Sequence, residues 1–266
     1  EALSLDLFWW ALFPVGLGFA LLVYCTALKV RLYALVDLIW TVGLGAGALI
    51  FFLLSGANSL RDWVVLAIVL LWSGRLSLHL FKDRILAGKE DPRYSALADY
   101  WGEKADRNFI FIFLGQIPLV ALFLLPVTLA FGQTEATWRW LDTLALVIAI
   151  TALGGEYLAD RQLARFRADP ANKGGVCRDG LWRYSRHPNY FFEWLHWFSY
   201  VAFAAGAAYS GWAWLGPVMM YVFLRYITGV PFAERSSLRS RGEAYRDYQR
   251  TTSVFFPWEP QRDTQP

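Results

Sequence analysis

The segment Gly180-Leu181-Trp182-Arg183-Tyr184-Ser185-Arg186-His187-Pro188-Asn189-Tyr190-Phe191-Phe192-Glu193-Trp194 begins in a basic loop and ends inside an apolar run. Pro188 suits the first turn of a helix, because that position needs no backbone donor. A helix that begins there places Asn189, Glu193, His196 and Tyr200 on one face. Asn and Glu side chains are costly in hydrocarbon, so the segment predicts a membrane helix whose polar face has a function.

Three side chains just before this helix, Arg183, Arg186 and His187, are cationic or titratable. The free N–H groups at a helix N-terminus also attract anions. We therefore expect a phosphate-binding entrance that leads to the Glu193 carboxylate within the membrane. The alternative is a basic anchor at the membrane surface, followed by an ordinary span.

The composition around this segment is that of a polytopic helical membrane protein. Of the 266 residues, 56% are hydrophobic and 18% are charged, and 14 are Trp. Such values do not fit an ordinary soluble domain. The net charge of +3 gives no reason to expect nucleic-acid binding. The spacing of Cys25 and Cys177 suggests neither a zinc site nor a disulfide framework, so we expect no metal.

Seven apolar runs are long enough, at about 17–25 residues, to cross a membrane as helices. We therefore expect an all-α fold, a seven-transmembrane-helix bundle that forms a single domain over residues 1–266. The first run lacks a basic leader and an obvious cleavage site, so we interpret it as a span and not as a signal peptide. The expected spans are Phe8–Leu28, Leu35–Leu54, Val64–Phe81, Phe109–Phe131, Trp140–Ala159, Tyr190–Ala207 and Trp212–Phe232.

Lysine and arginine are distributed unequally between the two sides of this bundle. Of the 25 such residues, only Arg61 and Arg139 fall on the side of the N-terminus, and Arg75 and Arg225 fall within spans. The others lie in the loops and the tail on the opposite side. Since basic loops stay in the cytoplasm, we expect a cytoplasmic C-terminus and an N-terminus outside.

Ionisable residues within the spans fall mostly in the cytoplasmic halves. Facing lipid would cost about 2.5–3.5 kcal/mol for each, so we expect them to converge on a polar cavity that opens to the cytoplasm. Two alternatives are structural: Arg75 and His79 satisfy polar groups on other helices, or Asp37 is simply the partner of Arg75. The residues concerned are Asp37, Arg75, His79, Glu156, Asp160, Glu193, His196 and Arg225.

Three further segments have structural interpretations. Gly43–Gly47 lies inside the second span with no preceding strand, so it indicates small-residue helix packing and not a nucleotide loop. The loop Asp83–Asn108 is amphipathic and is expected to cap the cavity at the membrane surface. The apolar end of the tail, Val254–Trp258, is a candidate for folding back to the interface, the alternative being a solvated basic tail.

A cytoplasmic pocket rich in Arg, with aromatic walls, suits a phosphate-bearing soluble cofactor and a lipid-soluble substrate. The planar guanidinium donates two hydrogen bonds at once to a phosphate group. The chain has no Rossmann unit, so helices and loops would have to hold a dinucleotide such as NADPH.

Several of these motifs together resemble the steroid 5-alpha-reductase superfamily. They are Gly180–Tyr190 with Glu193, the upstream Ala159–Gln162, and the tail from Glu234-Arg235 to Tyr245 and Tyr248. The resemblance covers most of the chain from Val36 onward, as in bacterial members, and implies a bacterial inner-membrane location. The Arg186–Tyr190 segment is also similar to sterol reductases and to isoprenylcysteine carboxyl methyltransferases, which bind S-adenosylmethionine.

The resemblance implies an enzyme that uses NADPH to reduce the carbon–carbon double bond of a 3-oxo-4-ene steroid or a similar enone. Hydride goes to the β carbon, and a positioned acid meets the ketone oxygen. By position, Asp37 and His79 match the Glu and Tyr of the animal enzymes, although the residue types differ. We expect a protonated Asp37, hydrogen-bonded to His79, to donate the proton, with Tyr33 and Tyr94 as reserve donors.

For the cofactor, the resemblance implies that Asn189 and Glu193 hold the nicotinamide and ribose. The residues expected to line the path to the phosphates are Asp160, Gln162, Arg186 and His187. Further candidates for cofactor binding are Lys173, Arg183, Tyr190, Arg225, Glu234, Arg235 and Tyr248. The expected partners are a steroid-like lipid and membrane lipid, and the protein is expected to be a monomer. The rival functions are a methyltransferase that uses S-adenosylmethionine and a non-catalytic sterol- or lipid-binding membrane protein.

Overall fold

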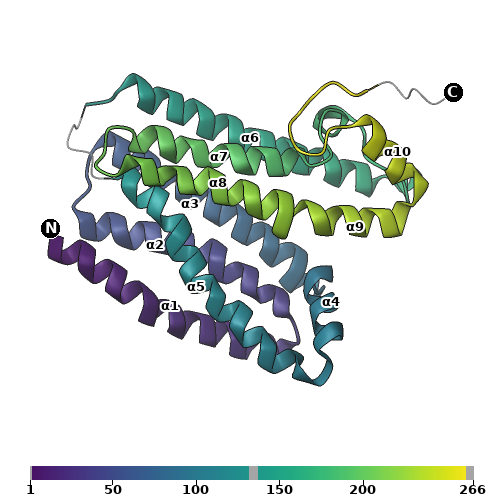
Figure 1. Ribbon diagram of the computed structural model, residues 1–266, viewed down its shortest axis with the longest axis horizontal. Helices are drawn as coiled ribbons and strands as arrows, with labels where there is room; N and C mark the ends of the chain where they lie inside the picture. The colour runs from purple at the N-terminus through teal and green to yellow at the C-terminus, as the bar shows by residue number, and fades with distance from the viewer. Residues whose placement is uncertain (1, 132–136, 262–266) are drawn as a thin grey trace. The chain divides into compact units, whose positions relative to one another are not determined.

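The computed structural model describes residues 2–131 and 137–261 (Figure 1). Helices and turns make up this part of the chain, without a β-strand. Six helical stretches in it are long and apolar enough to cross a membrane, which confirms an all-helical chain compatible with an integral membrane protein. The chain divides into two compact units, one of Glu1–Asp142 with Phe203–Leu215 and one of Thr143–Ala202 with Gly216–Pro266.

Local sequence signals set the helix boundaries in the first unit. Gly56, with φ of 69°, ends one helix in the left-handed conformation, and a capping box between Ser59 and Asp62 begins the next. Asp91 caps the short helix that follows, with Pro92 at its first position. The helices are α1 (Ala2–Val30), α2 (Val36–Ser55), α3 (Leu60–Leu80) with a π-helical extension (Phe81–Leu86), α4 (Pro92–Trp101) and α5 (Ala105–Ala130).

Helix α2 packs against α3 and α5 through small residues, as the Gly43–Gly47 segment predicts. A Cβ atom added at Gly43 would lie 3.1 Å from the Val120 side chain on α5, and one added at Gly47 would lie 2.5 Å from that of Leu124, so larger residues here would require α5 side chains to move. On the α3 side, the Ser73 hydroxyl donates to the Thr41 carbonyl at 2.7 Å. Hydrogen bonds of this kind between close-packed helices are typical of membrane bundles.

The two arginines on the predicted outer side, Arg61 and Arg139, share one buried carboxylate, that of Asp142. Arg61 NH2 lies 2.8 Å from Asp142 Oδ2, and these side chains are 1% and 0% exposed. Arg139 NH2 lies 2.8 Å from Asp142 Oδ1 and also donates to the Phe203 carbonyl at 2.9 Å. No sequence pattern indicated this cluster, which connects the start of α3, the start of α6 and the end of α7.

In the second unit, α6 (Trp140–Ala168) and α7 (Pro188–Ala204) lie side by side (Figure 1). Gly155 of α6 faces the ring of Phe192 of α7, where an added Cβ atom would clash. The Trp194 indole donates to the Pro217 carbonyl at 3.0 Å, which attaches α7 to α8. The remaining helices are α8 (Leu215–Val222), a π-helical turn (Phe223–Ile227), α9 (Val230–Arg241) and α10 (Glu243–Thr251).

The last predicted span is interrupted, and the one before it is short. Trp212–Phe232 is not one regular α-helix: a 3₁₀ turn, α8 and a π-helical turn precede a break at Thr228-Gly229, and α9 begins beside Pro231. Pro231 has no N–H to continue the ladder, while Thr228 and Gly229 both bond to the Phe223 carbonyl. Helix α7 begins at Pro188 as predicted, but its 17 residues give a length of only about 25 Å. The predicted span Trp212–Phe232 lies within one of the six long apolar stretches, Ser210–Arg241, whereas the span predicted at Tyr190–Ala207 stays a prediction.

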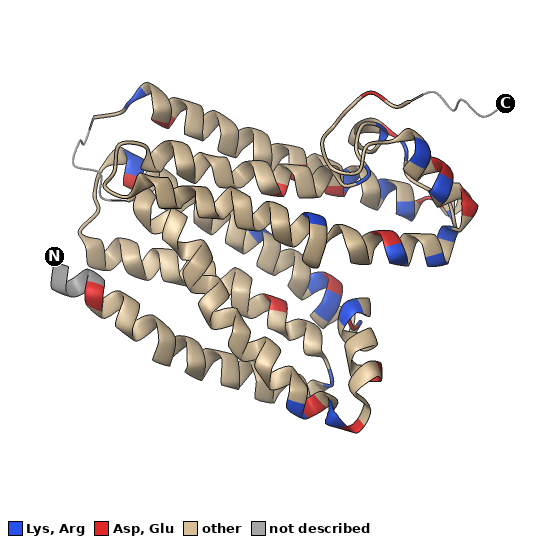
Figure 2. Ribbon diagram, viewed as in Figure 1, with Lys and Arg blue, Asp and Glu red and all other residues tan. Residues whose placement is uncertain are grey.

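Charged residues are sparse along the long helices and gather at helix ends and on α4, α9 and α10 (Figure 2). The tail after α10 folds back as expected. The Trp258 N–H donates to the Tyr184 carbonyl at 2.9 Å, and the Ser185 hydroxyl donates to the Phe255 carbonyl at 2.9 Å. The segment therefore packs on the loop before α7 with Phe255 buried and with Phe256 and Trp258 exposed, and its place at a membrane interface stays a prediction.

Candidate functional site

Asp37 lies in the first turn of α2 and accepts hydrogen bonds from two neighbouring residues of α4. The Tyr94 hydroxyl donates to Asp37 Oδ1 at 2.5 Å, and Arg93 NH2 donates to Oδ2 at 2.9 Å. Tyr94 is buried, whereas Asp37 and Arg93 are half-buried. The arrangement holds the phenol hydroxyl on the Asp37 carboxylate, with the Arg93 guanidinium over the Tyr94 ring at 5.1 Å.

Asp91 positions Arg93 within this cluster. Arg93 Nε lies 3.0 Å from Asp91 Oδ1, and Arg84 NH2 lies 3.0 Å from Asp91 Oδ2. Burial disfavours the Asp91 carboxylate, but the hydrogen bonds from Arg93 outweigh burial and lower its pKa. Asp91 therefore stays ionised and fixes the guanidinium that reaches Asp37.

The expected hydrogen bond between Asp37 and His79 is wrong. His79 is about half exposed, and its Nε2 lies 3.4 Å from Asp83, one turn further along the chain. The Asp37 oxygens are occupied by Arg93 and Tyr94 instead. The signal for Tyr94 was in the sequence, because Asp91-Pro92 is a helix start that puts Tyr94 in the first turn.

Tyr33, the other predicted reserve proton donor, packs and hydrogen-bonds within the protein. Its ring stacks on Phe109 with centroids 3.7 Å apart, and its hydroxyl donates to Asp106. Arg31 pairs with the same carboxylate at 3.1 Å. The Ala34 N–H donates to Glu90 Oε1 at 2.9 Å, so acidic groups hold the whole turn before α2.

In the second unit, Asn189 has a buried acceptor that is left without a partner. Its Nδ2 donates to Asp160 Oδ1 at 3.3 Å, so the structure brings these two predicted residues together. Its Oδ1 is buried and accepts no hydrogen bond within the described part of the chain. A buried polar atom without a partner costs about 1–3 kcal/mol, and in native proteins it calls for an explanation such as a bound ligand.

The polar face of α7 continues from Asn189 into the helix as predicted. Glu193, His196 and Tyr200 are all buried. Glu193 Oε1 accepts a hydrogen bond from the Trp197 indole at 3.2 Å, and His196 Nε2 lies 3.0 Å from the Tyr200 hydroxyl. The face is therefore a hydrogen-bonded row inside the protein.

Gln162 and Tyr248 hold the loop that precedes α7. Gln162 Oε1 accepts from the Leu181 N–H at 2.9 Å, and the buried Tyr248 hydroxyl donates to the carbonyls of Trp182 and Ser185. Burial raises the pKa of Tyr248, and burial, followed by the charge of Glu234, raises that of Tyr245 to about 12. Both phenols therefore remain neutral hydrogen-bond donors at physiological pH.

Arg186 and Glu234 also act within the protein. Arg186 Nε lies 2.6 Å from Glu234 Oε1, and NH1 donates to the carbonyls of Gln249 and Thr252 at 2.9 and 2.7 Å. Gln249 Nε2 donates to Glu234 Oε2 at 2.9 Å. The guanidinium thus joins the loop to α9 and α10, a role that the sequence analysis missed.

His187 stacks on Tyr190, with ring centroids 5.3 Å apart, and its Nε2 lies 3.4 Å from Glu234. Burial lowers the pKa of His187, although Glu234 opposes the shift, so the ring is neutral at neutral pH. His187 therefore adds no positive charge to the predicted phosphate-binding entrance at the start of α7.

The other predicted phosphate ligands lie at or near the surface. Lys173, Arg183 and Arg235 are exposed, and Arg225 is half-buried. Arg235 lies over the Phe232 ring at 4.6 Å and Arg225 over the Tyr226 ring at 5.0 Å. Stacked guanidinium groups keep their charge and their outward N–H donors.

Comparison with known proteins gives a family and a relative, both without a described function. A family model described as "Protein of unknown function (DUF1295)" matches residues 23–252. The chain is 28% identical over 254 residues to a Schizosaccharomyces pombe protein described as "Uncharacterized protein C594.04c", covering 84% of this chain and 72% of that protein. No solved structure matches the chain.

Proposed function

This chain belongs to the DUF1295 family, and on that premise we propose that it is an integral membrane reductase that uses NADPH. The proposed reaction saturates the carbon–carbon double bond of a 3-oxo-4-ene steroid or a similar enone. The family includes steroid 5-alpha-reductase-like proteins, which agrees with the motifs in Gly180–Glu193.

The observation that carries the proposal is the buried, unpartnered Oδ1 of Asn189. A carboxamide such as that of nicotinamide has an NH₂ group that can satisfy this acceptor. Asp160, which holds the other end of the Asn189 amide, fixes its orientation. NADPH, when bound, would supply the hydride. The exposed Lys173, Arg183 and Arg235 are the cations free of buried ion pairs that suit its phosphates.

The acid that the reaction requires is assigned to Tyr94. Negative charge develops on the ketone oxygen as hydride arrives, and a fixed hydroxyl donor stabilises it. Asp37 holds the Tyr94 hydroxyl in place, and Arg93 holds Asp37. The Asp37 carboxylate keeps the proton on the phenol, and the positive charge of Arg93, which lies over the Tyr94 ring at 5.1 Å, partly offsets that effect.

The proposal is tested by titrating the purified protein with NADPH and, separately, with S-adenosylmethionine. We expect NADPH to bind and Asn189→Ala to weaken its binding about ten-fold, the effect of one hydrogen bond. Asn58→Ala is the matched control, because Asn58 lies in the turn between α2 and α3, which holds no residue assigned to the cofactor, and the affinity of this variant for NADPH should stay within two-fold of wild type. Isothermal calorimetry or fluorescence of the bound nicotinamide measures the NADPH affinity of both variants.

Two outcomes would contradict this assignment. Binding of S-adenosylmethionine without NADPH binding would favour the methyltransferase. Retention of a sterol with no binding of either cofactor would favour the non-catalytic lipid-binding protein.

A further inference from the structure

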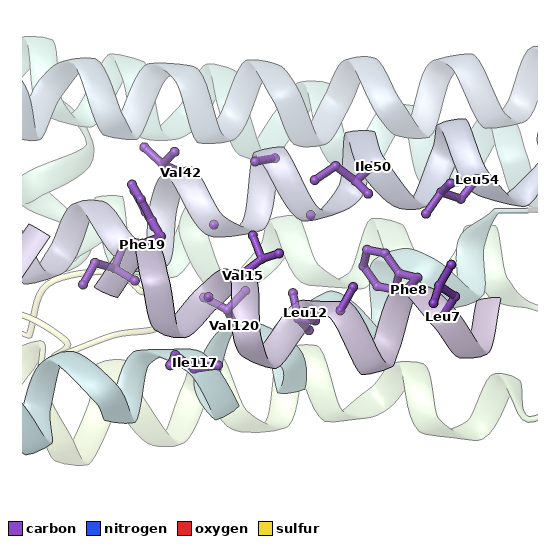
Figure 3. A pocket seen from close by; sticks show the side chains of 16 residues that line it. Leu7, Phe8, Leu12, Val15, Phe19, Val42, Ile50, Leu54, Ile117 and Val120 are labelled. Atoms are coloured by element: carbon purple, nitrogen blue, oxygen red, sulfur yellow. The ribbon is translucent and has the colours of Figure 1, made fainter. Parts of the chain in front are cut away.

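An apolar cavity of about 400 Å³ lies in the first unit, between α1 and α2, with part of α5 at one side (Figure 3). All 16 residues that line it are apolar. Val15, Val42 and Ile50 are partly exposed at the surface of the unit, so the cavity opens outward. In a membrane-spanning chain, such an opening faces hydrocarbon.

The cavity is long. Its lining runs from Leu7 to Phe19 on α1 and from Ile39 to Leu54 on α2. Fifteen helical steps on α2 correspond to about 22 Å. An extended hydrocarbon chain can follow this whole length, whereas four fused rings are shorter.

The walls are shaped for close contact with such a chain. Ala11, Gly16, Gly43, Ala46 and Gly47 are all small, which leaves room between the helices. In lipid an apolar chain gains nothing from leaving water, so its preference for this site must come from packing and from a polar end group.

One end of the cavity approaches polar groups. Phe19 and Ile39 line that end, and Ile39 belongs to the same packed core as Tyr33. Asp37 lies two residues before Ile39, and Glu90 caps the turn just before it. Arg93, which pairs with Asp37, and the largely exposed Arg31 bring positive charge to the same turn. A lipid in the cavity would therefore have its polar end at this turn and its chain along α1 and α2.

We propose that this cavity binds the single hydrocarbon chain of an amphiphilic lipid. The site does not depend on the reductase chemistry, and its test needs no cofactor. The probes are palmitic acid with a diazirine on its chain and a 4-ene-3-keto steroid with a diazirine. Each is photolysed with the full-length protein in phosphatidylcholine vesicles without NADPH, and the labelled peptides are identified by mass spectrometry.

We expect the palmitate probe to label residues 7–19 and 39–54, and excess unlabelled palmitate to abolish that labelling. Ala46→Trp fills the cavity and should reduce labelling at least ten-fold. Leu49→Trp, on the same helix but outside the lining, should change it less than two-fold.

Labelling that excess palmitate does not reduce would be contact with bulk lipid and would overturn the proposal. Equal labelling in Ala46→Trp and wild type would overturn it as well. Stronger labelling of this cavity by the steroid probe would show that rings, and not a chain, occupy it. Should Ala46→Trp not fold, the palmitate competition in wild type still decides. A protein that binds palmitate here but oxidises no NADPH would leave this site standing and remove only the proposed function.

Discussion

Tyr94→Phe is expected to slow enone reduction by about 10²–10⁴-fold, the usual contribution of a positioned proton donor. The substitution removes only the hydroxyl that lies 2.5 Å from Asp37 Oδ1. The affinity for NADPH should stay unchanged, because Tyr94 is not among the residues assigned to the cofactor. The measurement is the rate of NADPH oxidation at saturating cofactor and enone, with melting temperature recorded to show that the variant is folded.

Tyr100→Phe is the matched control for this experiment. Tyr100 lies on the same helix, α4, but is 84% exposed, so its loss should change the rate less than two-fold. Asp37→Asn should also slow turnover, since it weakens the contacts that hold the phenol. Full activity in Tyr94→Phe, together with a large loss in Asp37→Asn, would return the acid role to Asp37.

Asp142→Ala is expected to destabilise the protein by about 3–5 kcal/mol, the cost of leaving buried charge without its partner. The change leaves both Arg61 and Arg139 without the carboxylate that they share at 2.8 Å. The free energy of unfolding can be measured by denaturant titration in detergent micelles.

Asp83→Ala is the control variant, because it removes one member of an exposed ion pair where Asp142→Ala removes one from a buried cluster. Its ion pair with His79 is 60% exposed on the Asp83 side, and exposed pairs contribute at most about 1 kcal/mol. The double variant Arg61→Met with Asp142→Leu should recover part of the lost stability, because it removes both members of one buried pair. Equal effects of Asp142→Ala and Asp83→Ala would show that the buried cluster is not a structural anchor.

Patterns along one helix were readable from the sequence. The start of α7 at Pro188 and the buried face of Asn189, Glu193, His196 and Tyr200 follow from helical spacing alone. The close packing at Gly43–Gly47 follows from residue size. Each of these features depends on residues a few positions apart, where geometry is fixed.

Side-chain pairing across large sequence separations was not readable. Asp37 pairs with Tyr94, 57 residues away, and not with His79. Arg186 looked like a phosphate ligand because it precedes a helix, yet its donors serve Glu234 and the carbonyls of Gln249 and Thr252. A basic residue near a helix N-terminus has the same sequence signature whether it binds a ligand or the protein's own tail.

Transfer of deuterium from 4-deuterated NADPH to an enone is the measurement that tests the proposed function most directly. With 4-cholesten-3-one as the probe and cofactor of each C4 configuration, we expect one cofactor to give the saturated ketone with one deuterium on the β carbon. Mass spectrometry and NMR of the product locate that atom. A product that is an alcohol with deuterium on the carbonyl carbon would contradict the account, and so would NADPH that stays unoxidised with every enone supplied.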